Sequence, residues 1–482
     1  MLLSKLISNT NSTLLQGNLS QEIANIQFDS RKITENSLFV AIKGTLTDGH
    51  QYIDKAIELG AKAIIVEDMP TKIIENITYL KSQNTAKALG ILASNFYDNP
   101  SSKIKIVATT GTNGKTTVST LLFKLFKELG YKTGLLSTVQ NQINDDIFPT
   151  QLTTPDALTM QFLLSEMVKK GCSYCFMEAS SHALVQDRLS GIQLAGGVFL
   201  NITHDHLDFH QTFDNYIKAK KILFDTLPKN AFALTNIDDK RGRVMLQNCI
   251  ASTQKTFALQ SIADFKGKIV ENTLQGLFLE INNESAWFRL IGEFNAYNLV
   301  TVFAVATLLE QDTQEILLAL SGLNGAAGRF EQQRGKTGKT GIVDYAHTPD
   351  ALKNVLETIE TLKMPPAEVI TVIGCGGDRD KTKRPIMTKI ACEFSDKVIL
   401  TSDNPRSENP TTILEDMQQS ISFEYRKKIT IIENRKEAIQ FACENAENTD
   451  IILIAGKGHE NYQEIMGIKY PFDDKEVLKE FL

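Results

Sequence analysis

The residues between Gly111 and Thr117 have the types and the order of a phosphate-binding loop, reading Gly-Thr-Asn-Gly-Lys-Thr-Thr. In such a loop, backbone N–H groups and the positive end of the following helix favour phosphate. Lys115 can then reach the β- and γ-phosphate oxygens, and the Thr116 hydroxyl can ligate Mg²⁺. Thr109 stands where the complete pattern has its first glycine. The sequence therefore predicts ATP and Mg²⁺ as ligands, at a loop that departs from the full pattern at one position.

A strand before the loop and a helix after it would hold these residues in place. The strand is predicted over 105–108, and the helix is predicted to begin at Thr116 and to end near Gly130. Six apolar residues recur at three- and four-residue steps and form one helical stripe: Val118, Leu121, Leu122, Leu125, Phe126 and Leu129. A Gly-Lys-Thr helix start without a ligand is the competing interpretation, and the flanking strand and long helix disfavour it.

Composition bounds the class of protein. The chain has 482 residues, 42% of them apolar, and single cores stop growing at about 250–300 residues, so three domains are expected. The net charge of −6 argues against nucleic acid as a partner. The N-terminus lacks a signal-peptide pattern, and no apolar run approaches the roughly 18 residues of a membrane span. We expect a cytoplasmic monomer with small-molecule partners and no membrane insertion.

The six cysteines do not suggest a disulfide framework in so long a chain. Cys172 and Cys175 have the C-x-x-C spacing, but no second pair completes a metal site. We interpret them as buried thiols.

Residues 1–102 have the pattern of a small α/β domain. Short apolar runs at 37–42 and 61–66 alternate with turn signals such as Thr47-Asp-Gly49. Ser30 and Arg31, just before a strand, could hold a diphosphate, although such residues are more often a turn and a surface charge. Residues 99–102 are predicted to be a linker.

Residues 103–331 contain acidic and histidine clusters suited to metal and phosphate chemistry. Glu178 follows an apolar run and would stand at a strand exit, where ligand groups of open α/β sheets collect. The segment 204–210 holds three of the seven histidines, His204, His206 and His210. A binuclear metallohydrolase is a competing class, but its signature has histidine where Phe209 stands.

A lysine and an arginine complete this block. Lys220 shares a predicted helical face with Tyr216 and Leu223, and snorkelling to solvent is the simplest explanation for it. Arg329, near the end of the block, could meet a triphosphate.

Residues 332–482 are predicted to form a doubly wound, Rossmann-like domain, because apolar strands alternate with helical stretches. Four strands are predicted, at 342–343, 369–373, 398–400 and 451–454. The charged motifs that follow them begin at Asp344, Gly374, Asp403 and Gly456. Ligands in such sheets lie at the carboxyl ends of the strands. Arg379 occupies the third glycine position of a dinucleotide fingerprint, so NAD is not expected.

Taken in order, these motifs resemble the Mur ligases of peptidoglycan synthesis along the whole chain. The resemblance is carried by Gly111–Thr117, Glu178–His182, Asp205–Asp208, Tyr216–Lys220, Gly328–Glu331 and Asp344–His347. Three further motifs narrow it to the MurE type, which adds the third residue of the stem peptide: Thr153–Pro155, Asp403–Arg406 and Gly456–Glu460.

The resemblance implies an α/β chain of three domains: residues 1–102 for the uridine nucleotide, 103–331 as a P-loop domain for ATP, and 332–482 for the amino acid. For ATP it implies Gly111, Thr112, Asn113, Gly114, Lys115, Thr116, Thr117, Asn295, Arg329, Asp344 and His347. For the UDP-N-acetylmuramoyl dipeptide it implies Phe28, Ser30, Thr45, Leu46, Thr47, Thr153, Thr154, Ser180, Gln186 and Arg188. For Mg²⁺ it implies Thr116, Glu178, His206 and Lys220, the last as a carbamate. Lys115, Lys220, His206 and Glu178 would be catalytic. This reverses the snorkelling interpretation of Lys220.

The activity implied is ATP-dependent amide formation on the D-glutamate carboxylate of UDP-N-acetylmuramoyl-L-Ala-D-Glu, through an acyl phosphate. Diaminopimelate is expected as the amine, held by Arg379, Asp403, Asn404, Pro405, Arg406, Gly456 and Glu460. Arg406 offers a fork for a carboxylate that lysine lacks. A lysine-adding ligase and a folylpolyglutamate-synthetase-like ligase are the nearest alternatives. A metallohydrolase would act without ATP, and a P-loop switch protein would consume no amino acid.

Overall fold

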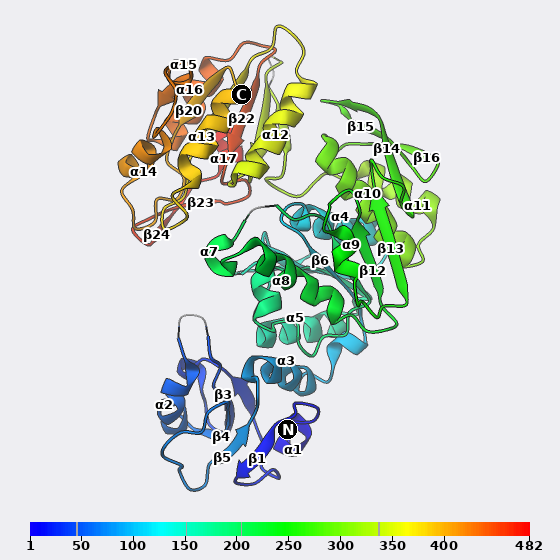
Figure 1. Cartoon of the computed structure of the whole chain (residues 1–482), viewed down its shortest axis with the longest axis vertical. Helices are drawn as coiled ribbons and strands as arrows, with labels where there is room; N and C mark the ends of the chain where they lie inside the picture. The colour runs from blue at the N-terminus through cyan, green and yellow to red at the C-terminus, as the bar shows by residue number, and fades with distance from the viewer. Residues whose placement is uncertain (45–46, 151, 204, 336–337) are drawn as a thin grey trace. The chain divides into compact units, whose positions relative to one another are not determined.

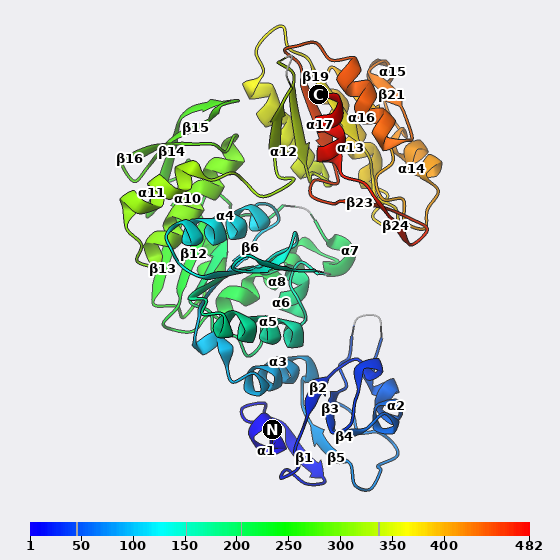
Figure 2. The ribbon, with the colours of Figure 1, turned by 180° about the vertical axis from the view of Figure 1, so that it is seen from behind.

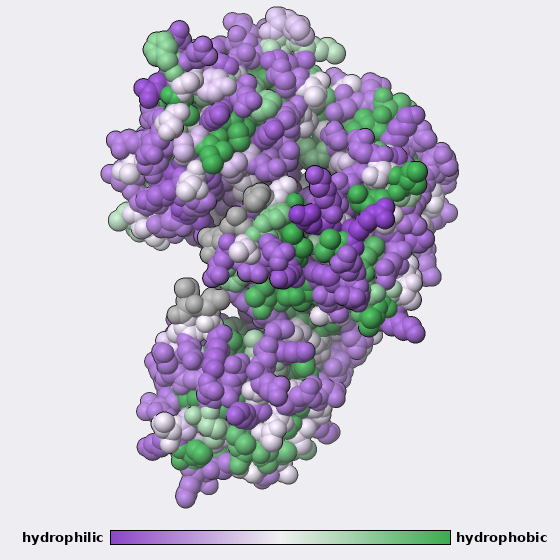
Figure 3. Space-filling view, viewed as in Figure 1, coloured by the Kyte–Doolittle hydropathy of each residue, from purple (hydrophilic) through white to green (hydrophobic). Residues whose placement is uncertain are grey.

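The structure is a computed structural model, and it describes residues 1–44, 47–150, 152–203, 205–335 and 338–482. The chain packs into two compact units, which we describe separately. The first comprises residues 1–111, 122–201 and 214–256. The second comprises residues 112–121, 202–213 and 257–482. Hydrophilic side chains cover most of the face seen in Figure 3, with small apolar areas between them. Across the described ranges, no helix is long and apolar enough to cross a membrane.

The N-terminal part of the first unit is a five-stranded sheet with helices on both faces (Figure 1). The strands are β1 (Thr13–Gln16), β2 (Asn25–Gln27), β3 (Ser37–Val40), β4 (Ala61–Val66) and β5 (Thr78–Lys81), in the order β1-β5-β4-β3-β2. The helices are α1 (Leu3–Leu6), α2 (Ile53–Glu58) and α3 (Thr85–Phe96). Alternate side chains of β3 face opposite ways: Leu38 packs with α1 and α3, and Phe39 with α2.

The rest of the first unit is built on a mostly parallel sheet. Its strands are β6 (Lys105–Thr110), β7 (Thr133–Leu136), β8 (Asn141–Ile143), β9 (Asp146–Phe148), β10 (Tyr174–Glu178), β11 (Gly196–Phe199) and β12 (Phe232–Asn236), in the order β12-β11-β6-β10-β7-β8-β9. β6, β7, β10, β11 and β12 are parallel, and β8 and β9 are antiparallel additions. The helices of this region are α5 (Ala157–Lys169), α6 (Ser181–Val185), α8 (Phe213–Asp225), α9 (Gly242–Leu246) and the later part of α4 (Lys115–Glu128). The beginning of α4 and all of α7 (Leu207–His210) belong to the second unit.

The strand–loop–helix prediction around residue 115 is confirmed, with different ends. β6 runs two residues further than predicted, and α4 begins one residue earlier, at Lys115. Five of the six predicted stripe residues are fully buried, whereas Leu129 lies beyond the helix and is partly exposed. The predicted linker at 99–102 is an ordered 3-10 turn, and Ser101 Oγ accepts a hydrogen bond from Gln193 N at 3.1 Å.

The second unit contains an antiparallel segment that precedes the C-terminal domain. It comprises β14 (Phe265–Thr273), β15 (Gly276–Ile281), β16 (Glu284–Phe288), α10 (Glu293–Leu308) and α11 (Thr313–Gly322). β13 (Thr253–Ala258), which begins in the first unit, pairs parallel with β14. β14, β15 and β16 pair antiparallel, α10 packs on β14, and α11 on β16.

The C-terminal domain is doubly wound, as predicted. Its strands are β17 (Glu331–Arg334), β18 (Thr340–Asp344), β19 (Val369–Ile373), β20 (Lys397–Leu400), β21 (Ile429–Ile431) and β22 (Ile451–Ala455), in the order β17-β18-β22-β19-β20-β21, with only β17 antiparallel. The helices are α12 (Pro349–Leu362), α13 (Lys383–Phe394), α14 (Pro410–Met417), α15 (Phe423–Arg426), α16 (Arg435–Glu444) and α17 (Asp474–Phe481). α12 and α13 cover one face, and α16 and α17 the other (Figure 2). A hairpin, β23 (Tyr462–Ile465) and β24 (Ile468–Pro471), follows β22.

The four predicted motif strands are β18, β19, β20 and β22. They are parallel neighbours, so the motifs that follow them meet at one edge of the sheet. The same edge therefore carries Asp344, Gly374, Asp403 and Gly456.

Candidate active site

The phosphate loop ends in the first residue of α4. Lys115 Nζ donates to Thr112 O at 2.9 Å, and Thr112 Oγ1 accepts from Thr203 N at 3.0 Å. Gly114 has a φ of +89°, a conformation that favours glycine. The loop is thus a tight turn at a helix N-terminus, which is a site for anions.

Arg329 brings a guanidinium to the start of α4. Its Nη2 lies 3.3 Å from Thr116 Oγ1, and its Cζ lies 4.5 Å from the centre of the Tyr345 ring. Within the described part of the chain, the buried Nε of Arg329 has no hydrogen-bond partner. Arg329 therefore has donor capacity beside the loop.

Asp344 is the last residue of β18, His347 follows that strand, and both lie near Arg329. Asp344 is buried and its Oδ2 accepts from Phe330 N at 2.6 Å. Burial raises the pKa of Asp344 to about 6, although the Arg329 charge opposes the shift. His347 Nδ1 lies 2.8 Å from Tyr345 O, and the ring stands edge-on to Tyr345. Asn295, on α10, donates to Ile291 O at 2.8 Å.

The residues predicted for the muramoyl dipeptide form one hydrogen-bond network in the first unit. Thr154 Oγ1 donates to Glu178 O at 2.8 Å and accepts from Ser180 N at 3.1 Å. Arg188 binds Thr154 O through Nη1 at 2.7 Å and Gln186 Oε1 through Nη2 at 2.6 Å. Burial lowers the pKa of Arg188. Thr153 adjoins this network in sequence.

The residues predicted for Mg²⁺ occur in both units. Glu178 ends β10, is buried, and accepts from Thr138 N at 2.8 Å and Thr138 Oγ1 at 3.2 Å. Lys220 is also buried, at 1% exposure, and donates to Gly111 O at 2.8 Å. Snorkelling is therefore wrong for Lys220, because its Nζ is bonded inside the protein and lies 4.5 Å from the Tyr216 ring centre.

His206, another residue predicted to bind Mg²⁺, has a φ of +53°. Its Nε2 lies 3.4 Å from Asp205 Oδ2. The residues that the structure describes contain no cluster of three or more His, Cys, Asp or Glu side chains arranged for a metal. His204 falls outside the described residues, and His210, in α7, is buried.

The residues predicted for the uridine nucleotide lie in the N-terminal domain. Phe28 packs against the core that contains α1 and α3, and Ser30 is the buried first residue of a 3-10 turn, Ser30–Lys32. Thr47 O accepts from Gly44 N at 3.0 Å. Thr45 and Leu46 lie outside the described residues.

Arg406 and Arg379 flank Gly376 after strands β20 and β19. A Cβ at Gly376 would lie 2.9 Å from Arg406 Nη1 and 3.8 Å from Arg379 Cγ. Arg406 Nη1 donates to Gly377 O at 2.7 Å, and Arg406 Nε lies 3.8 Å from Glu464 Oε2. Pro405 O packs so closely on Gly377 that a Cβ there would be 1.9 Å from it. The guanidinium of Arg406 and the aliphatic stem of Arg379 thus lie beside one another at the carboxyl edge of the sheet.

Acidic and amide groups lie beside these arginines. Asn404 Nδ2 donates to Glu460 Oε2 at 2.7 Å. Gly456 has a φ of +117°, and a Cβ there would lie 2.5 Å from Asp403 Oδ2, so glycine is required. Asp403, Asn404, Glu460 and Gly456 therefore form one cluster, as predicted.

Sequence reasoning missed four contacting residues. Lys457 is fully buried among Asp403, Asn404 and Glu460. The Glu464 carboxylate lies 3.8 Å from Arg406 Nε, and Thr138 N donates a hydrogen bond to the Glu178 carboxylate. Asp350 accepts a hydrogen bond from Asn113 Nδ2 at 2.9 Å. Lys457 was detectable, because it lies inside the Gly456–Glu460 motif, whereas the others depend on long-range packing.

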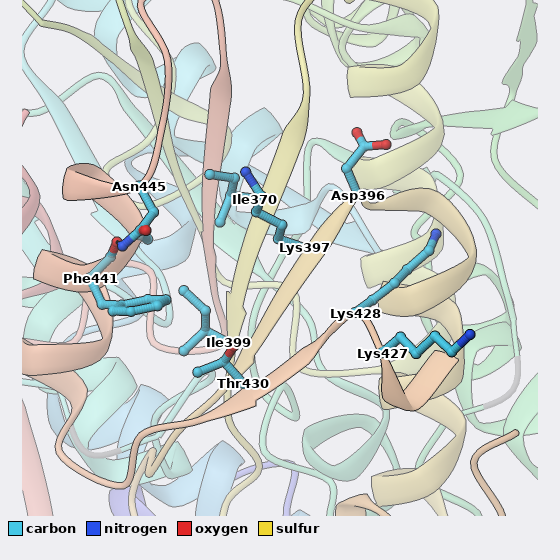
Figure 4. A pocket seen from close by; sticks show the side chains of 10 residues that line it. Ile370, Asp396, Lys397, Ile399, Lys427, Lys428, Thr430, Phe441 and Asn445 are labelled. Carbon is cyan, nitrogen blue, oxygen red and sulfur yellow. Dashed lines mark hydrogen bonds between the residues drawn. The ribbon is translucent and has the colours of Figure 1, made fainter. Parts of the chain in front are cut away.

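A pocket of about 420 Å³ opens at the opposite edge of the C-terminal sheet (Figure 4). Its apolar lining includes Ile370, Ile399 and Phe441. Lys397, Lys427 and Lys428 also line it. Lys428 Nζ is bonded to Cys392 O and Ser395 O, both at 2.9 Å. The pocket contains none of the predicted site residues.

All six cysteines are buried, and burial raises the pKa of Cys172 to about 11, which confirms the buried-thiol interpretation.

Three family models match the chain in order. They are the "Mur ligase family, catalytic domain" at residues 22–97, the "Mur ligase middle domain" at 109–306 and the "Mur ligase, glutamate ligase domain" at 328–458.

Full-length relatives are also similar. A Cytophaga hutchinsonii protein named UDP-N-acetylmuramoyl-L-alanyl-D-glutamate--2,6-diaminopimelate ligase is 55% identical, covering 100% of this chain and 99% of the relative. A Phocaeicola vulgatus protein of the same name is 53% identical with the same coverage. A solved structure of a ligase of that name has a TM-score of 0.72 at 32% identity, covering 100% of this chain and 98% of that one.

Proposed function

Because this chain belongs to the Mur ligase family, we propose that it is the ATP-dependent ligase that joins 2,6-diaminopimelate to UDP-N-acetylmuramoyl-L-alanyl-D-glutamate. The observation that carries the substrate choice is the pair Arg406 and Arg379 beside the Asp403–Glu460 cluster. A side chain that ends in both a carboxylate and an ammonium needs cationic and anionic partners side by side, and this edge of the sheet supplies both.

In the first half-reaction, the D-glutamate carboxylate attacks the γ-phosphorus of ATP, the bond to the β–γ bridging oxygen breaks, and ADP leaves. An acyl phosphate is formed. A carboxylate is a poor acyl donor because its leaving group would be oxide, and phosphorylation replaces it with phosphate. Lys115 and Arg329 stabilise the charge on the transferring group, and the N-terminus of α4 adds backbone donors. We assign Arg188 and Thr154 to the dipeptide.

In the second half-reaction, the free amine of diaminopimelate attacks the acyl carbon, a proton leaves the nitrogen, and the C–O bond to phosphate breaks. The amide and inorganic phosphate are the products. Arg406 holds the distal carboxylate, and Glu460 accepts from the distal ammonium. Fixing the far end of the substrate aligns the reacting amine, and such positioning lowers the barrier of a two-substrate step.

Mg²⁺ is the remaining part of the proposal. Thr116, Glu178, His206 and a carbamylated Lys220 would hold it, and the bound metal would neutralise phosphate charge. Three of these four offer oxygen atoms, which Mg²⁺ prefers. A carbamate on Lys220 would be a buried anion, and the bound Mg²⁺ would supply the opposite charge that a buried charged group requires.

The domain boundaries at 102 and 331 are also part of the proposal. The N-terminal domain would take the uridine diphosphate through the partly buried Phe28, the buried Ser30 and the exposed Thr47. Asn295, Asp344 and His347 would surround the nucleotide.

An omission assay tests the proposal. Phosphate release is measured with ATP, the UDP-dipeptide and diaminopimelate, and again with each one left out, and the product mass is determined. We expect stoichiometric release only with all three. Release without an amino acid would favour a switch protein, release without ATP a hydrolase, and release with glutamate and a folate instead of the UDP-dipeptide a folylpolyglutamate ligase.

A further inference from the structure

Lys457 is a charged side chain with no contact to solvent. It follows β22 and has 0% exposure. Lysine is rarely buried without partners, because removing an ammonium from water is costly. The partners of Lys457 therefore indicate what it does.

Those partners are the residues proposed to bind the amino acid. Lys457 Nζ lies 3.1 Å from Asn404 Oδ1, 3.2 Å from Glu460 Oε2 and 3.9 Å from Asp403 Oδ1. Asn404 Nδ2 donates to the same Glu460 oxygen at 2.7 Å. Glu460 Oε2 thus accepts two hydrogen bonds from within the protein, which fix the rotation of its carboxylate and leave Oε1 for a ligand.

The same lysine also orients the arginine side of the site. Asn404 Oδ1, which accepts from Lys457, also accepts from Glu464 N at 2.9 Å. Glu464 in turn accepts from Arg406 N at 3.0 Å through its backbone oxygen. One ammonium therefore anchors the turn that carries Arg406 and the hairpin strand β23.

The charges of this cluster fit one substrate ammonium. Asp403 and Glu460 together carry two negative charges, and Lys457 cancels one of them. The remaining charge matches the single distal ammonium of diaminopimelate, while Arg406 matches the distal carboxylate.

Resting on the proposed function, we infer that Lys457 is a positioning residue for the amino acid: it holds Glu460 and Asn404 in the orientation that receives the distal ammonium. It does not touch the substrate, because its Nζ is enclosed by its partners. It acts through Glu460, and this separates it from a residue that only stabilises the fold.

A double-mutant cycle tests the inference. The KM for diaminopimelate is measured in the parent, Lys457→Met, Glu460→Gln and the double variant. Methionine keeps the unbranched stem and removes the charge. We expect Lys457→Met to raise KM about tenfold or more in the parent background, because charged hydrogen bonds are lost. In the Glu460→Gln background the same change should raise KM by less than about threefold. Equal losses in both backgrounds would overturn the inference.

Two controls keep the outcomes distinct. Lys436→Met removes an exposed lysine–glutamate pair, to Glu480 at 2.9 Å, in the same domain and should leave KM unchanged. If Lys457→Met alone does not fold, the double variant is compared with Glu460→Gln instead, because the double variant leaves no unpaired charge at Glu460. A KM in the double variant that is tenfold or more above that of Glu460→Gln would count against action through Glu460. ADP affinity reports whether each variant is folded. A parent that does not use diaminopimelate at all would refute the proposed function instead.

Discussion

Replacing Arg406 with alanine should separate diaminopimelate from lysine as substrates. In the structure Arg406 Nη1 is held by Gly377 O, and Nε is 3.8 Å from Glu464, beyond hydrogen-bond distance. The guanidinium can thus give a carboxylate two further hydrogen bonds, worth about 1.5–3 kcal/mol each. Losing both would cost about 3–6 kcal/mol, or roughly 10²–10⁴ in kcat/KM. The side chain is 24% exposed, so screening favours the lower part of that range, about 10²–10³.

The assay is phosphate release at saturating ATP and UDP-dipeptide with varied amino acid. The parent should prefer diaminopimelate over lysine by a similar factor, because lysine leaves the guanidinium unpaired. Arg406→Ala should lose activity with diaminopimelate while its weak activity with lysine stays within about threefold. Arg426→Ala, an exposed arginine of α15, is the matched control. Comparable use of both amino acids by the parent, or full diaminopimelate turnover in the variant, would refute the reasoning.

Three further predictions concern the nucleotide side. Lys115→Ala should lower kcat by about 10³-fold or more, because it removes the positive charge that stabilises the transferring phosphoryl group. The thermal midpoint should change little, because Lys115 is not part of a hydrophobic core. Unchanged turnover would exclude the ATP assignment. Lys220→Ala should be inactive and recover part of its activity with added short-chain carboxylates, whereas full activity without them would rule out a required carbamate. Asp344→Asn should remove a pH-dependent term from stability: the raised folded pKa favours the protonated acid, so the parent should lose about 2 kcal/mol relative to the variant as pH rises from about 4 to about 6. Urea unfolding at both pH values measures this, and a difference that does not vary with pH would contradict it.

Local pattern was sufficient to find the strands and the edge at which the site lies. β19 and β4 have the predicted bounds, and β18, β20 and β22 differ by one or two residues. The reason is that a parallel strand buried on both faces is a continuous apolar run, and its carboxyl end must face the ligand edge. The motifs after these strands could therefore be placed together without knowing the order β18-β22-β19-β20.

Pattern within one element failed where a side chain is satisfied by a distant one. Lys220 has the helical spacing of a snorkelling lysine, and its partner, Gly111 O, is 109 residues away in sequence. Asp350 has the position of an ordinary first-turn acid of α12, yet it receives Asn113 from the phosphate loop. No periodicity encodes such pairs, because they are set by the packing of whole elements.

The contact between two motifs gives a physical reason for their joint presence. Gly328, next to Arg329, has a φ of +64°, and a Cβ there would lie 2.2 Å from both Gly458 C and His459 N. Gly458 is equally confined, with Gly328 O and Tyr345 Cβ both 2.7 Å from its Cβ position. The backbone that carries Arg329 thus packs directly on the turn that carries Lys457 and Glu460. On the proposed function, the acyl phosphate and the attacking amine must come within about 3–3.5 Å of one another. Gly328 and Gly458 permit backbone contact between the two motifs, and this contact makes that approach sterically possible. Neither motif alone explains why both positions are glycine.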